Sequence, residues 1–292
     1  MRKTFFTLLM ILMNISLMAT PKILRSSDMA ELELKALSED LMQYDVIFFG
    51  EHHGNAILHE LQKDILPGLH TANRDLILSF EMWERDTQGV LDAFLAAKIP
   101  EDEFILDSRA WPNYEDYRPL LIFAREHGLN AIAANIPRQY ASRTAREGWD
   151  FVQKLPDEER EFIAAKLTAP DDSYKKEFMQ VMGKMGAHGM QKEAMENLYK
   201  AQCIKDDTMA ESIVLALMEK PQARVIHFNG DFHSRSFLGT VSRLIDSMPQ
   251  LKVAVLTPQL IAEGENLPLP EEAKTLGTHL ILIPADTREA SR

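Results

Sequence analysis

Two histidines follow apolar runs with the same spacing from a glycine. The first motif is GEHH at residues 50–53, and the second is GDFH at residues 230–233. A glycine allows the backbone to turn sharply at the end of a strand, and an imidazole three residues later can then point back over the sheet edge. We therefore expect His53 and His233 to lie at one site.

Carboxylates accompany both histidines, because Glu51 lies within the first motif and Glu81 ends another apolar run. Imidazole and carboxylate groups suit a divalent metal ion, with His53, Glu81 and His233 as candidate ligands. The same groups suit a histidine general base oriented by a carboxylate. In that case Glu51, His53, Glu81 and His233 are the catalytic candidates. The residue types leave both kinds of site open.

Other side chains could hold a larger ligand. Residues 179–195 contain five methionines, three glycines and His188, and thioether and imidazole groups can ligate soft metals or haem iron. Tyr174 could supply a phenolate to ferric haem, and His52 is a further imidazole beside the first motif. Arg138 could bind a carboxylate or propionate through two hydrogen bonds. The simpler interpretation of residues 179–195 is a helical hairpin packed by methionines.

The elements that must position these residues alternate along the chain. Near-continuous apolar runs are typical of strands buried on both faces, and they occupy residues 45–50, 75–81, 129–135, 224–230, 252–257 and 279–284. Helical patterns lie between them, at residues 28–43, 56–69, 87–97, 114–127, 137–148, 191–218 and 237–247. This order predicts a three-layer α/β/α fold with a largely parallel sheet. Residues 150–200 have no strand pattern and predict a helical insertion in the single domain of residues 20–292.

Ligands of an open parallel sheet bind outside the carboxyl ends of its strands. The first and second runs end next to Glu51 and at Glu81, and the fourth is followed by the second histidine motif, so these residues should lie at that edge. The third run leads towards Arg138. The predicted topology therefore gathers residues that are far apart in sequence. We expect the site to lie between this edge and the helical insertion.

The composition and the first residues of the chain limit the possible classes of function further. Residues 1–19 have a basic start followed by an apolar stretch, which predicts a secretory signal peptide and a periplasmic or secreted protein. No second stretch is apolar enough for a membrane span after the signal is removed. The net charge of −12 argues against nucleic acid as a partner. The single cysteine, Cys203, excludes an internal disulfide framework and a lipid-modified cysteine after the signal.

Together these residues resemble the ChaN-like family of haem-binding uptake proteins, within the wider Tiki and erythromycin-esterase superfamily. The resemblance runs from residue 45 to residue 258. It is carried, in this order, by FFGEHH, ILSFEMWERDTQGVLDAFLA, WPNYEDYRPLLIFAREHGLNAIAANIPR, AQCIKDDTMAESI and HFNGDFHSRSFLGTVSRL. The superfamily's two Gly-x-x-His motifs and glutamate correspond to GEHH, GDFH and Glu81.

The resemblance implies an exported haem-binding protein of iron uptake, which forms a homodimer with haem at the subunit interface. Haem would then be held near the sheet edge and the helical insertion, with His52, Arg138, Tyr174 and His188 as candidate binding residues. Superfamily relatives are hydrolases that depend on a metal or on a histidine. The alternative is therefore a hydrolase that uses Glu51, His53, Glu81 and His233, with or without a divalent metal ion.

Overall fold

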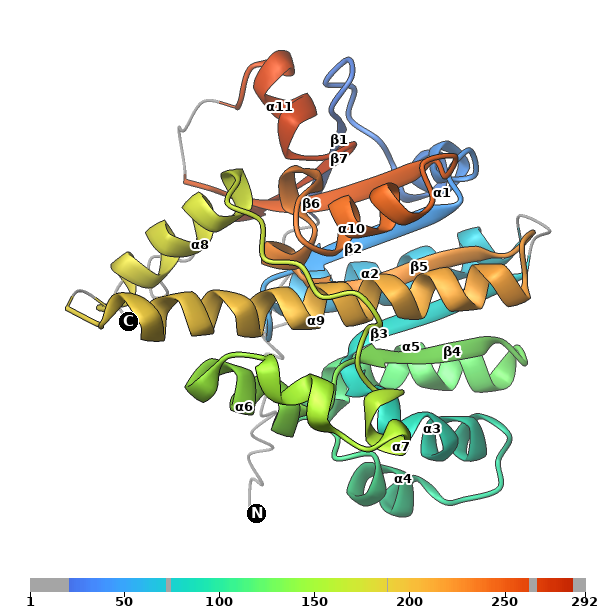
Figure 1. The fold of residues 1–292 in the computed structure, drawn as a ribbon. Helices are drawn as coiled ribbons and strands as arrows, with labels where there is room; N and C mark the ends of the chain where they lie inside the picture. Colours follow the sequence, from blue (N-terminus) through green and yellow to red (C-terminus); the bar gives the residue numbers. More distant parts are fainter. Residues whose placement is uncertain (1–20, 72–74, 188, 263–266, 286–292) are drawn as a thin grey trace, which may run out of the picture.

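A seven-stranded sheet forms the centre of the molecule (Figure 1). The computed structural model describes residues 21–71, 75–187, 189–262 and 267–285. The predicted signal peptide, residues 1–19, and His188 lie outside the described residues. The strands are β1 (Lys22–Arg25), β2 (Val46–Glu51), β3 (Leu76–Glu84), β4 (Asn130–Asn135), β5 (Arg224–Gly230), β6 (Val253–Ile261) and β7 (His279–Pro284).

The strands lie in the order β1-β7-β6-β2-β5-β3-β4, and all neighbouring pairs are parallel except β1 with β7. Each of the six apolar runs forms a strand, so this part of the prediction is confirmed. The sequence pattern did not reveal β1, because its four residues are too few to show a period. In the central pair, Glu51 of β2 lies beside Gly230 of β5, which brings the two histidine motifs to the same edge.

Helices cover both faces of the sheet, which confirms the α/β fold with three layers (Figure 1). One face packs against α1 to α5, through a cluster of buried side chains that includes Phe49, Phe80 and Phe228. The other face packs against α9 and α10. These helices are α1 (Leu34–Leu41), α2 (Ala56–His70), α3 (Gln88–Leu95), α4 (Glu101–Asp107), α5 (Tyr114–Glu126), α9 (Lys192–Glu219) and α10 (Thr240–Ser247). A further helix, α11 (Pro270–Leu276), precedes β7.

Residues 150–200 contain helices and, in their described part, no strand. They include α7 (Asp157–Arg160), α8 (Ser173–Lys184) and the start of α9, and they follow α6 (Arg138–Glu147). Figure 1 shows α8 and the first turns of α9 extending past the edge of the sheet. Tyr174 of α8 stacks on Phe232 after β5, with ring centroids 5.0 Å apart. This contact ties the region to the carboxyl end of β5.

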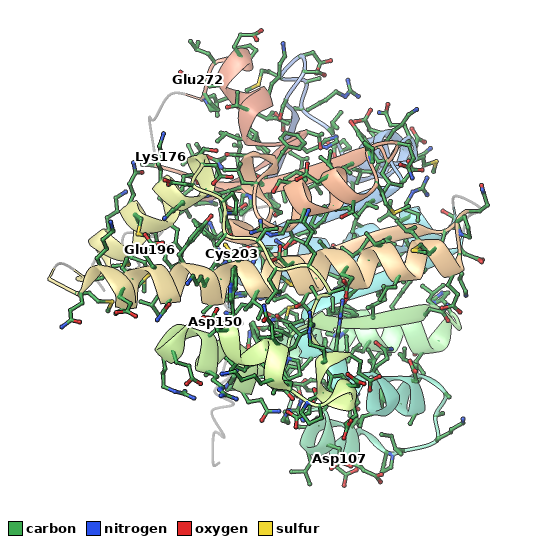
Figure 2. All side chains as sticks on the ribbon, in the orientation of Figure 1. Asp107, Asp150, Lys176, Glu196, Cys203 and Glu272 are labelled. Carbon is green, nitrogen blue, oxygen red and sulfur yellow. The ribbon has the colours of Figure 1, made fainter. Side chains whose placement is uncertain are left out.

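Side chains fill the spaces between these layers (Figure 2). Cys203 is a free thiol buried on α9, and burial raises its pKa to about 12. Among the described residues, no helix combines the length and the apolar character that crossing a membrane requires.

Candidate functional site

A cavity of about 450 Å³ lies at the carboxyl ends of the strands, between the sheet edge and helices α6, α8 and α9. One part of its wall is apolar and includes Trp111, Ile136, Phe178, Met182 and Leu198. The polar part includes His53, Glu81, Glu84, Asn135, Arg138, Gln202 and Lys205. The cavity therefore combines an apolar surface with three basic and two acidic side chains.

A larger hollow, of about 810 Å³, lies along the edge strand β4, between α3 and the second half of α9. Its charged side chains include Arg85, which donates hydrogen bonds to Glu211 and Ser212. The amide of Gln88 donates to the carbonyl of Ala131 and accepts from the N–H of Ala133, so it covers part of the strand's open edge. None of the residues predicted for the site lines this hollow. The candidate site is therefore the smaller cavity.

The turn after β2 places His53 at the cavity. Gly54 adopts a φ of 76°, a backbone conformation that favours glycine. The side chain of Asn55 then caps α2 by accepting from the N–H groups of Ile57 and Leu58. The His53 side chain is 45% exposed, and its Nδ1 lies 2.7 Å from Glu51 Oε1. This hydrogen bond raises the pKa of His53 above its ordinary value.

Glu51 itself is buried and receives several donors. Tyr117 donates its hydroxyl to Oε1 at 2.6 Å, and Gln62 donates its amide to Oε2 at 2.5 Å. With His53 also on Oε1, the carboxylate has three side-chain partners, which compensate for its removal from water. Burial and the nearby Glu51 carboxylate raise the pKa of Tyr117 far above its ordinary value. Tyr117 is therefore a neutral donor.

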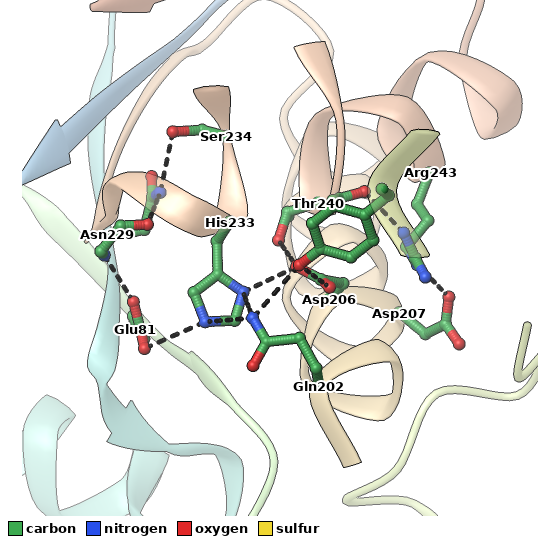
Figure 3. A network of polar contacts seen from close by, with 12 residues as sticks. Glu81, Gln202, Asp206, Asp207, Asn229, His233, Ser234, Thr240 and Arg243 are labelled. Carbon is green, nitrogen blue, oxygen red and sulfur yellow. Dashed lines mark hydrogen bonds and ion pairs between the residues drawn. The ribbon is translucent and has the colours of Figure 1, made fainter. Parts of the chain in front are cut away.

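The second histidine lies behind the cavity wall rather than on it, and Figure 3 shows its contacts. His233 Nε2 is 3.3 Å from Glu81 Oε1, and His233 Nδ1 is 2.7 Å from Asp206 Oδ1. Burial would lower the pKa of His233, but these two carboxylates raise it to about 9. Burial would raise the pKa of Glu81, but attraction to His233 holds it well below its ordinary value. The group is an ion triad with a central imidazolium.

Asp206 of α9 is the centre of a further set of donors. Thr240 donates to its Oδ1 at 2.8 Å, and Tyr174 donates to its Oδ2 at 2.7 Å. Tyr174 is 1% exposed, and burial together with the Asp206 charge raises its pKa well above the ordinary value. The phenol of Tyr174 is thus neutral and directed at Asp206. The structure does not bring it into the cavity.

The glycines of the two motifs have a different role from the one expected. Gly50 and Gly230 lie inside β2 and β5 and do not have positive φ. A Cβ at Gly50 would lie 2.7 Å from Asp231 Oδ1, and a Cβ at Gly230 would lie 2.9 Å from His53 Nε2. The expectation that they turn the chain was therefore wrong. They permit close approach between the motifs, and Gly54 makes the turn.

The predicted site residues are brought together only in part. His53, Glu81 and Arg138 line the cavity, and Glu51 and His233 contact those that do. His52 is partly exposed and is not among the described residues that line it. His188 lies outside the described residues.

Sequence reasoning missed Trp111, Gln202, Lys205 and Asp206 as members of the site. The signal for Asp206 was a pair of adjacent aspartates inside an otherwise buried helical pattern, since buried carboxylates need partners. Trp111, Gln202 and Lys205 have residue types that are common on any helix or loop. Only the packing of α9 and the loop before α5 against the sheet edge places them here.

A divalent metal ion would need several of these groups to face one point. Both ring nitrogens of His233 are directed at carboxylates, and Glu81 Oε2 accepts the N–H of Gly230 at 2.6 Å. Among the described residues, no group of three or more His, Cys, Asp or Glu side chains has an arrangement that could hold a metal ion. Glu81 and His233 are instead partners of each other.

The ion triad predicts a pH-dependent stability. The pKa of His233 is raised from 6.5 to about 9, so its contribution is complete below pH 6.5 and is lost as the pH rises through about 9. The pKa values of Glu81 and Asp206 are lowered, so their contributions are lost in acid. We expect the free energy of unfolding, measured in urea, to fall by roughly 1–3 kcal/mol between pH 6.5 and 9.

His233→Gln should remove most of this alkaline decrease. His70→Gln, at the end of α2 and outside the ion triad, should retain it. A wild-type free energy of unfolding that stays constant over this pH range would contradict the imidazolium assignment.

Comparisons with known proteins agree with this architecture. Residues 37–244 match the family described as haem-binding uptake, Tiki superfamily, ChaN. The chain is similar to a solved structure of ChaN of Campylobacter jejuni, described as showing cofacial haem binding. That likeness has a TM-score of 0.67 and 16% identity, and it covers 89% of this chain and 96% of that chain.

A mutant erythromycin esterase in its open conformation is a more distant likeness. It has a TM-score of 0.46 and 11% identity, and the match covers 92% of this chain and 85% of that chain. A comparison with curated proteins found no match. The match of the family over residues 37–244 spans most of the sheet and every residue of the cavity. The chain belongs to the ChaN family of haem-binding uptake proteins, in the Tiki superfamily.

Proposed function

We propose that this protein binds haem in the cavity at the strand ends, with His53 Nε2 as an axial ligand of the iron. The observation that carries the proposal is which of the two ring nitrogens of His53 has a hydrogen-bond partner. Its Nδ1 is held by Glu51, and no partner for its Nε2 is found in the described part of the chain. A histidine whose other nitrogen is held by a carboxylate is the usual form of a metal-ligating imidazole.

The walls of the cavity suit the two chemical faces of haem. The macrocycle is apolar and would lie against Phe178, Met182 and Leu198, while the propionates would be attracted to Arg138 and Lys205. The volume of about 450 Å³ lies within the range of small-molecule sites. The residues present therefore fit haem.

Other candidate ligands are less well placed for this role. Tyr174 would first have to break its hydrogen bond to Asp206, and His233 would have to leave two carboxylates. Each of these changes would leave a buried carboxylate short of a partner, which is costly. His53 can act without such a rearrangement, so we place it ahead of Tyr174, His52 and His188.

Titration of the purified protein with haemin, followed by the Soret band, tests this proposal. The wild type should bind with a shifted Soret band. His53→Ala should lose more affinity than the about 10-fold loss typical of removing an outer-shell partner. Arg138→Ala and Lys205→Ala should each cost up to about fivefold, because partly exposed ion pairs contribute about 0.2–1 kcal/mol.

His127→Ala, which removes an exposed imidazole at the end of α5, is the matched control and should bind haemin like the wild type. Unchanged haemin binding in His53→Ala would remove His53 from the role of ligand. Turnover of ester or peptide substrates that is lost in His53→Ala, while haemin binding remains, would favour the hydrolase instead.

We also propose that two copies associate around haem. The proposal is supported by exposed apolar side chains at the turn between α8 and α9, the two helices that line one side of the cavity, since Met185 is 75% exposed and Met190 is 45% exposed. Methionine adapts readily to an apolar surface. Haemin should therefore double the molar mass measured by light scattering in the wild type. A mass that does not change with saturating haemin would contradict this proposal.

Export is proposed from the sequence of residues 1–19 alone. Its basic start and apolar stretch are those of a secretory signal. We expect the protein recovered from the periplasm of an expressing bacterium to lack this segment in an intact-mass spectrum. Full-length protein found only in the cytosolic fraction would contradict export.

A further inference from the structure

We propose that the outer edge of β4 binds an extended basic peptide segment of a partner protein, which joins the sheet there as a parallel strand. The site is the hollow of about 810 Å³ along β4. It is separate from the cavity at the strand ends, since no described residue lines both. The inference therefore goes beyond the proposed function and does not depend on it.

The strand β4 ends the sheet, and within the described part of the chain its only strand neighbour is β3. An edge strand presents backbone N–H and C=O groups that can pair with a further strand. The N–H and C=O of one residue in a strand point the same way. Those of Ala131 and Ala133 face away from β3 and towards the hollow, because both residues bond to Gln88 on that side.

Gln88, the first residue of α3, takes one position in the ladder outside β4. Its Nε2 donates to the carbonyl of Ala131 at 2.9 Å, and its Oε1 accepts from the N–H of Ala133 at 2.8 Å. In a parallel ladder, the residue opposite Ile132 makes this same pair of bonds to the residues before and after Ile132. Asp92 also accepts from Nε2, at 2.8 Å, and holds the amide in this direction. The side-chain amide therefore marks where one residue of a parallel strand fits.

The two sides of the hollow suit the alternating side chains of a strand. Because α3 covers one face of the sheet and α9 the other, successive side chains of an added strand would meet these helices in turn. On α3 they would meet Leu95 and Asp92, and on α9 they would meet Leu215 and Glu219. Residues three or four apart share one face of a helix. Each side thus offers one apolar and one acidic side chain.

The charges along the hollow favour a basic occupant. Its acidic side chains are Asp92, Glu161 and Glu219, and its basic ones are Arg85 and Lys220. Arg85 is paired with Glu211, whereas none of the three acidic side chains forms an ion pair within the described part of the chain. Lysine or arginine side chains of a peptide would supply these partners. The net charge of −12 would also attract a basic partner at longer range.

A second copy of this chain fits the edge less well than a basic peptide does. Two β4 strands related by a twofold axis would pair antiparallel, whereas Gln88 makes the bonds of a parallel neighbour. The twofold axis would also bring the same carboxylates of the two copies together. The direction of the ladder and the charge therefore both favour the peptide.

A short peptide tests the site in the purified protein without haemin. The probe is fluorescein-labelled Thr-Val-Lys-Lys-Val-Thr with blocked ends, which as a strand presents one valine and one lysine to each side. Fluorescence anisotropy should show saturable binding that weakens as the salt concentration rises. The analogue with glutamate in place of lysine should not bind. Hydrogen exchange of the Ala131 N–H, which faces the hollow, should become slower when the probe is bound.

Gln88→Ala removes the side chain that the peptide must displace. The probe should bind this variant about 2- to 12-fold more tightly, the effect of one net hydrogen bond. Leu215→Ser, at a side chain that is 53% exposed, should weaken binding by roughly 3- to 10-fold and tests the site even if Gln88→Ala does not fold. Met218→Ser is the matched control, because Met218 is 67% exposed on the same helix and does not line the hollow. It should bind the probe like the wild type.

Three results would overturn the inference. The first is no saturable binding of the basic probe by the wild type or by Gln88→Ala. The second is binding that leaves hydrogen exchange at Ala131 unchanged, which would exclude strand addition. The third is a doubled molar mass of Gln88→Ala in light scattering without improved probe binding, which would show that Gln88 only keeps copies of the chain apart. A failure to bind haemin would overturn the proposed function and leave all these measurements unaffected.

Discussion

The ion triad of Glu81, His233 and Asp206 is the interaction on which the arrangement of the site depends. Glu81 belongs to β3, His233 follows β5 and Asp206 lies on α9, so the triad joins two strands to the helix that forms one wall of the cavity. Burying each of these charges costs several kcal/mol. The cost is offset only when every charge has its partners, here the imidazolium and the donors Gly230, Tyr174 and Thr240. The position of α9 is therefore tightly specified.

The two Gly-x-x-His motifs have the same spacing but different roles, because the backbone turns in a different way after β2 than after β5. After β2, Gly54 turns the backbone and leaves His53 at the surface of the cavity. After β5, residues Asp231–His233 form a 3₁₀ turn that directs His233 into the layer beneath α9. Ser236 and Phe237 follow with φ values of 58°, which is uncommon outside glycine. One histidine is thus free to bind, and the other organises the structure.

Much of the fold was predictable from the sequence, because apolar runs and helical periods are local signals. The six long strands and the layers followed from them, and so did the edge at which the polar residues gather. What could not be predicted was which partner each side chain contacts. Tyr174 has the chemistry of a haem ligand, but its hydroxyl is directed at Asp206, and that contact depends on how α8 packs on α9. The role of Gly230 likewise depends on the distance to His53, which no spacing in the sequence records.

The chain has a negative net charge although basic side chains lie at the cavity wall, and distance decides which charges act on an anionic ligand. The chain has a net charge of −12, which would repel haem propionates at long range. At physiological ionic strength, however, interactions between exposed charges are screened beyond about 8 Å. Within that distance, Glu81 and Asp206 are paired with the His233 imidazolium and Glu84 is paired with Arg109, while Arg138 and Lys205 also lie at the cavity wall. The ion triad therefore also has an electrostatic role, because it pairs the Glu81 carboxylate at the cavity wall with the His233 imidazolium and so reduces the repulsion of an anionic ligand.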